Sequence, residues 1–176
     1  MHVDSRKTAI GGMAVALAVL CIVLSGVLEF NTLFLLAAAS FFPGIVIRES
    51  GLAAGAASYV AAAVLGFLLA PNKLYCITFA AMGFYVVCSE WLFRAVARAK
   101  GGRRFWLWLG KFAIFNLLYL PALTAFPRLI FAEGITGTWL LAAAAAGQVL
   151  FLVYDRAYEY FLTVLWEKFR TRLNLK

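Results

Sequence analysis

The sequence contains one histidine, His2, and its three cysteines, Cys21, Cys76 and Cys88, lie inside apolar runs without CxxC spacing. One histidine excludes a multi-histidine metal site and a catalytic triad that depends on histidine. Cysteines in such surroundings are typical of small buried side chains. We therefore expect neither a disulfide framework nor a metal site.

The chain also lacks a glycine-rich phosphate loop after a strand, which excludes nucleotide hydrolysis by this chain alone. Charged residues are scarce, at 14% of 176 residues, whereas 65% are hydrophobic. A soluble domain is about half apolar and about a quarter charged. This composition indicates a membrane protein, and we expect no enzymatic activity and no cofactor.

Six apolar runs are long enough to cross a bilayer as helices, and they cover about residues 9–28, 30–47, 51–70, 74–93, 105–126 and 135–157. A spanning helix needs roughly 20 apolar residues. The runs lack the period-two alternation of a barrel strand. The prediction is an all-α, integral membrane six-helix bundle that forms a single domain over residues 1–176, with an amphipathic tail over residues 158–176.

Basic residues gather on one predicted side of this bundle, at Arg6, Lys7 and Arg48 and in the segments 94–104 and 166–176, whereas the other side has Lys73 and Arg128. Cytoplasmic loops carry the excess of Lys and Arg. We therefore expect a cell-membrane protein with both termini in the cytoplasm. Anionic lipid head groups, rather than nucleic acid, are the expected partners of the basic segments.

Two ionisable side chains, Glu90 and Lys111, lie inside apolar runs. An ionisable residue within a membrane is either functional or paired. The spacing allows a Glu90–Arg94 salt bridge within one helix, and the order of the spans allows a Glu90–Lys111 pair between neighbouring helices.

The segment "LLAPNKLY" separates the third and fourth runs. Pro71 cannot continue a helix and biases Ala70 towards an extended conformation, so the third span is predicted to end there. Asn72 is suited to cap the start of the fourth helix through its side-chain oxygen.

Lys73 is unusual in this turn because a cation in the first turn of a helix opposes the positive end of the helix dipole. One reading is that its side chain reaches water or lipid phosphate. The other reading is that Lys73, together with Asn72, Tyr75 and Arg128, binds a carboxylate or phosphate of a ligand that enters from outside.

Polar side chains also occur deeper in the fifth and sixth runs, at Asn116, Tyr119 and Gln148. Because an unsatisfied amide in hydrocarbon is costly, they are predicted to face the bundle interior. They either form hydrogen bonds between helices or line a cavity that binds a small molecule.

Small residues recur at i, i+4 on the first helix, where Gly12 pairs with Ala16 and Ala14 with Ala18. Small faces allow two helix backbones to approach closely within lipid. Such a face packs either against the chain's own helices or against another membrane subunit.

The opening "RKTAIGGMAVALAVL", followed by five further spans, resembles the substrate-binding S components of energy-coupling factor (ECF) transporters. More narrowly, "ASFFPGIVIRESGL", "LLAPNKLY", "GFY" and "KFAIFN" resemble segments of a small membrane family often likened to S components. The resemblance implies that Ala14 and Ala18 dock a transmembrane T subunit. It also implies uptake of a small nutrient, vitamin-like or anionic, energised by partner ATPases.

The sequence departs from that family at "LEFNTL", which is only a turn where most S components have a longer loop over the substrate. The alternative is the rod-shape-determining membrane protein D family, whose members are scaffolds of cell-wall elongation with a similar size and number of helices. A polar cavity favours uptake, and a solid apolar bundle favours a scaffold.

Overall fold

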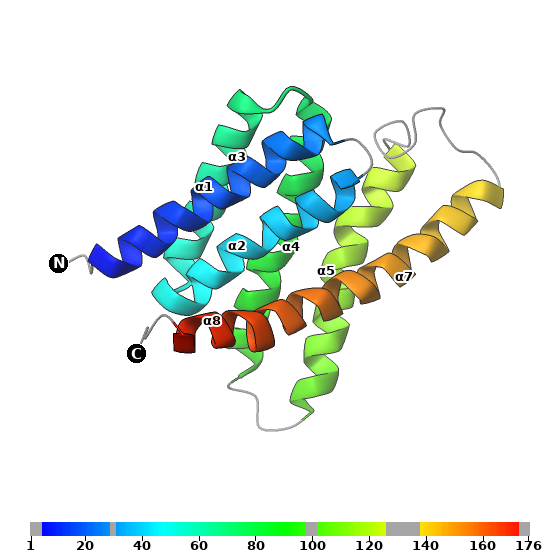
Figure 1. Cartoon of the computed structure of the whole chain (residues 1–176). Helices are drawn as coiled ribbons and strands as arrows, with labels where there is room; N and C mark the ends of the chain where they lie inside the picture. The colour runs from blue at the N-terminus through cyan, green and yellow to red at the C-terminus, as the bar shows by residue number, and fades with distance from the viewer. Residues whose placement is uncertain (1–4, 29–30, 98–101, 126–137, 173–176) are drawn as a thin grey trace. The chain divides into compact units, whose positions relative to one another are not determined.

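The chain is all-helical in the ranges that the computed structural model describes, which are residues 5–28, 31–97, 102–125 and 138–172. Six of its helices are long and apolar enough to cross a membrane (Figure 1). The chain is therefore a multi-pass helical membrane protein by length and composition.

The helices begin and end within a few residues of the predicted spans: α1 Ser5–Val27, α2 Thr32–Ser50, α3 Leu52–Leu69, α4 Lys73–Val96, α5 Arg103–Ala125 and α7 Thr138–Tyr160. The C-terminal part was predicted as an amphipathic tail over residues 158–176. The helical path continues into it from α7, through a π-helical segment, Phe161–Trp166, into α8, Glu167–Arg172.

Contacts divide the chain into two compact units, residues 1–98 and 99–176. Unit 1 contains α1 to α4, and unit 2 contains α5, α7, the π-helical segment and α8. The single domain expected from the sequence stays a prediction.

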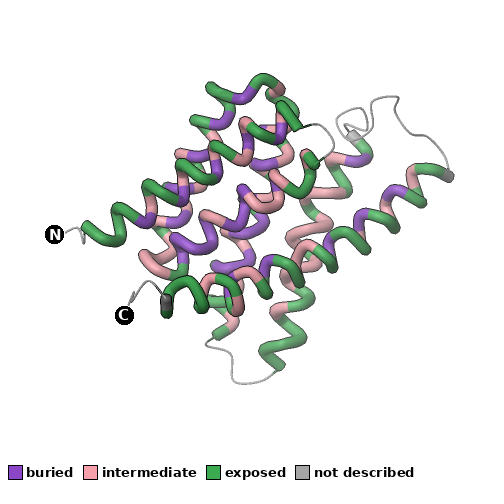
Figure 2. Tube along the Cα trace, viewed as in Figure 1, coloured by how far each residue is buried: buried purple, intermediate pink, exposed green. Residues whose placement is uncertain are grey.

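Unit 1 is a four-helix bundle with an apolar core. The core cluster consists of Ala18, Ile22, Leu36, Ala39, Ala62, Ala70, Cys76 and Phe79. Helix α2 contributes the longest buried stretch, from Pro43 to Ile47 (Figure 2). Pro43 lies inside this buried stretch, and membrane helices tolerate proline where neighbouring groups can satisfy the backbone carbonyl that it frees.

Glycines in unit 1 mark the places where its helices approach most closely. A Cβ atom on Gly55 would lie 2.0 Å from Ile47 Cγ1, and one on Gly66 would lie 2.9 Å from Ile22 Cδ1. A Cβ atom on Gly83 would lie 2.6 Å from the Tyr59 ring, whose hydroxyl donates to the Ala80 carbonyl at 2.8 Å. The small residues of α3 and α4 therefore pack within the chain.

In unit 2, α5 and α7 run in opposite directions, because Lys111 near the start of α5 contacts Asp155, whereas Tyr119 near its end contacts Ala143. Aromatic rings pack between the two helices. Phe151 of α7 stacks on Phe115 of α5 with ring centroids 4.4 Å apart.

Candidate functional site

The turn between α3 and α4 has the backbone structure that its sequence predicts. Ala70 is extended (φ −70°, ψ 137°), and α3 ends at Leu69. The side-chain oxygen of Asn72 accepts the backbone N–H of Leu74 at 3.0 Å, so Asn72 is the N-cap of α4. Both structural roles expected of Pro71 and Asn72 are confirmed.

Lys73 folds back from α4 onto the end of α3. Its ammonium group donates hydrogen bonds to the carbonyls of Phe67, Leu68 (3.5 Å) and Ala70 (3.1 Å), and it lies 5.1 Å from the centre of the Phe67 ring. The last carbonyls of a helix have no partner within the helix and carry its negative dipole end. Lys73 therefore caps α3, which explains a cation in the first turn of α4.

Tyr75 packs beside this turn. A Cβ atom on Gly26 of α1 would lie 2.6 Å from Pro71 Cγ and 3.9 Å from Tyr75 Cδ2, so the end of α1 closes over both rings. Arg128, the fourth member of the predicted anion site, lies outside the described residues. Ligand binding by Asn72, Lys73, Tyr75 and Arg128 stays a prediction.

Asn116 and Gln148 form a reciprocal amide pair between α5 and α7. Gln148 Nε2 donates to Asn116 Oδ1 at 2.9 Å, and Asn116 Nδ2 lies 3.4 Å from Gln148 Oε1. Asn116 Nδ2 also donates to the Phe112 carbonyl at 2.9 Å. The arrangement matches the expectation that these amides form hydrogen bonds between helices.

Tyr119 extends the same contact surface by one turn. Its hydroxyl donates to the Ala143 carbonyl at 2.8 Å, and its ring lies over Gly147, where a Cβ atom would be 2.3 Å from Tyr119 Cζ. The ring also stacks on Phe115 at 5.1 Å. Of the predicted binding residues, Asn116, Tyr119 and Gln148 thus lie together in unit 2, and Asn72, Lys73 and Tyr75 lie together in unit 1.

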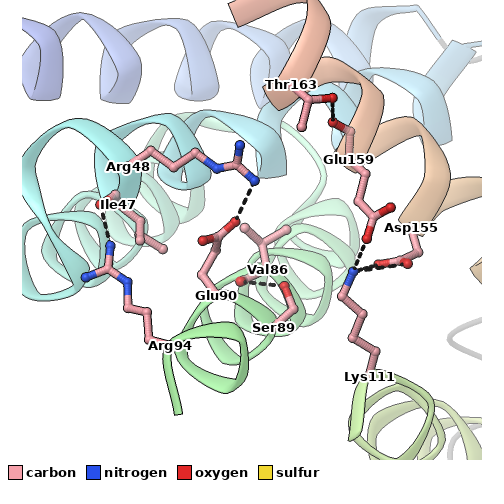
Figure 3. Close-up of polar contacts among 10 residues, drawn as sticks. All are labelled: Ile47, Arg48, Val86, Ser89, Glu90, Arg94, Lys111, Asp155, Glu159 and Thr163. Carbon is pink, nitrogen blue, oxygen red and sulfur yellow. Dashed lines mark hydrogen bonds and ion pairs between the residues drawn. The ribbon is translucent and has the colours of Figure 1, made fainter. Parts of the chain in front are cut away.

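Lys111 binds two carboxylates of α7 at once (Figure 3). Its ammonium lies 2.9 Å from Asp155 Oδ1 and 2.7 Å from Glu159 Oε1. The Lys111 and Asp155 side chains are 12% and 13% exposed, whereas Glu159 is 51% exposed. This triad was not predicted, although its signal is present: Asp155 and Glu159 are spaced i, i+4 and so share one helix face.

Glu90 pairs with Arg48 of α2 at 3.4 Å, and its side chain is 8% exposed (Figure 3). Arg94 donates to the Ile47 carbonyl at 2.8 Å. Two residues of α4 therefore hold the last turn of α2. Both ionisable residues inside the apolar runs are thus paired within their own unit, Glu90 with Arg48 and Lys111 with Asp155 and Glu159.

The four small residues of α1 lie on two different faces. Ala14 and Ala18 are buried, at 6% and 0% exposure, whereas Gly12 and Ala16 are exposed. The docking pair that the family resemblance implies is thus covered by the chain's own helices. Docking of a membrane partner on α1 stays a prediction, and the burial limits it to the face that carries Gly12 and Ala16.

The described part of the chain contains no cluster of three or more His, Cys, Asp or Glu residues that could hold a metal ion. No family model, curated protein or solved structure matches this chain. Its function must therefore be inferred from its own side chains.

Proposed function

We propose that this chain is a non-catalytic subunit of the cell membrane that works as a helical scaffold, binding other membrane components through its lipid-facing helices. One observation carries the proposal: the polar side chains inside the helices bond to one another within their own unit. Asn116 bonds Gln148, Lys111 bonds Asp155 and Glu159, and Arg48 bonds Glu90. Groups used in this way hold helices together, as expected of a scaffold.

The burial pattern supports the same class. A scaffold for membrane partners needs apolar surface around a rigid centre, and unit 1 has a packed apolar core. Its outward-facing residues include Met13, Leu17 and Leu20 on α1 and Val60, Val64 and Leu68 on α3. In lipid such faces are available to other helices, which associate through packing and hydrogen bonds.

The second candidate is the substrate-binding subunit of an ECF-type transporter, with a T subunit and ATPases as partners. The observation that favours it is the position of Lys73, which remains exposed although it caps α3. Its charge stands beside the first turn of α4, whose free N–H groups also attract anions. A vitamin-like or anionic nutrient is the ligand class that this turn suits.

Native mass spectrometry of the purified protein separates the two candidates. A scaffold should retain lipids and no other small molecule, and Lys73→Met should leave the set of retained molecules and the expression level unchanged. A retained small molecule that is lost in Lys73→Met or Asn116→Leu would instead assign the chain to nutrient uptake. Binding weakened tenfold by Lys73→Met corresponds to about 1.4 kcal/mol.

The orientation belongs to the same proposal, with both termini in the cytoplasm. A cysteine introduced at position 72 should react with an impermeant maleimide added outside intact cells, and one at position 101 should not. Labelling at position 101 would reverse the orientation.

A further inference from the structure

We draw no further inference here: the strongest candidate, the side-chain cluster of Lys111, Asp155 and Glu159 between α5 and α7, belongs to the site already described, and nothing in the described part of the chain shows a ligand or partner that it would hold.

Discussion

The two units of this protein hold their helices together by different means. In unit 1, small residues bring backbones close, as where Gly55 faces Ile47 and Gly66 faces Ile22. In unit 2, α5 and α7 are joined by hydrogen bonds, an ion triad and stacked rings. Half of the central residues of α2 are buried, compared with 6% of those of α5 (Figure 2).

The two units thus show two ways to hold helices together within a bilayer. Lipid tails are as apolar as leucine, so burying leucine between two helices gains little within a bilayer. Unit 1 therefore has glycines where its helices meet, and the missing side chains let the helix backbones come close and make more contacts. Unit 2 has few buried apolar side chains on α5 and instead depends on polar groups, whose loss leaves partners unsatisfied in a medium without water.

The largest effect is expected at the ion triad of unit 2. Replacing Lys111 by Met leaves the largely buried Asp155 without its ammonium partner. Loss of one partner from a buried pair typically costs 3–5 kcal/mol, and with Glu159 half-exposed we expect about 3 kcal/mol.

Unfolding in mixed micelles of sodium dodecyl sulfate and a nonionic detergent measures this change. Arg104→Met removes an exposed cation from the same helix and should have almost no effect. Equal stability of Lys111→Met and Arg104→Met would show that the triad does not hold α5 to α7.

A smaller effect is expected where unit 1 depends on close packing. A Cβ atom in Gly55→Ala would lie 2.0 Å from Ile47 Cγ1 and 2.9 Å from the Ile47 backbone nitrogen, so α2 and α3 must separate. Overpacking of this kind costs about 1–3 kcal/mol, and we expect about 2 kcal/mol in the same unfolding assay.

Gly12→Ala is the matched control for this substitution, because no atom lies within 4 Å of its added Cβ. It should stabilise α1 by up to about 1 kcal/mol through helix propensity. If both substitutions shift stability in the same direction, close packing at Gly55 is not the cause.

The smallest effect is expected at the amide pair. Asn116→Leu removes the hydrogen bonds to Gln148, and hydrogen bonds between membrane helices average about 0.6 kcal/mol. The double variant Asn116→Leu/Gln148→Leu leaves no amide unsatisfied and should recover most of the loss. A double variant that loses the sum of both single changes would mean that the two amides act independently.

The sequence predicts the helices well because their apolar runs are long, and Pro71 and Asn72 mark the boundary between α3 and α4 correctly through local backbone chemistry. The ion pairs are less predictable. The partner of Glu90 is Arg48, 42 residues away, and the partners of Lys111 lie 44 and 48 residues away. Such pairs depend on which helices are neighbours and how they are rotated, which charge and spacing along one helix do not determine.

The π segment was not predicted either, because its sequence "FLTVLW" continues the apolar pattern of α7 without a proline or glycine. The buried pair Ala14 and Ala18 shows the same limit. An i, i+4 pair of small residues is visible in the sequence, whereas the face that the chain's own helices cover is not.

The bonds that Lys73 makes have a consequence for membrane insertion. If α3 and α4 enter the bilayer as a helical hairpin, their connecting turn must pass through hydrocarbon, where an unsatisfied carbonyl costs several kcal/mol and a lone ammonium about 2.5–3.5 kcal/mol. Lys73 lowers both costs at once, because its ammonium donates hydrogen bonds to the carbonyls of Phe67 and Ala70. A turn whose cation is already bonded to the last carbonyls of α3 crosses the hydrocarbon with few unsatisfied groups. The lysine that caps α3 and begins α4 is therefore also expected to lower the free-energy cost of inserting this hairpin.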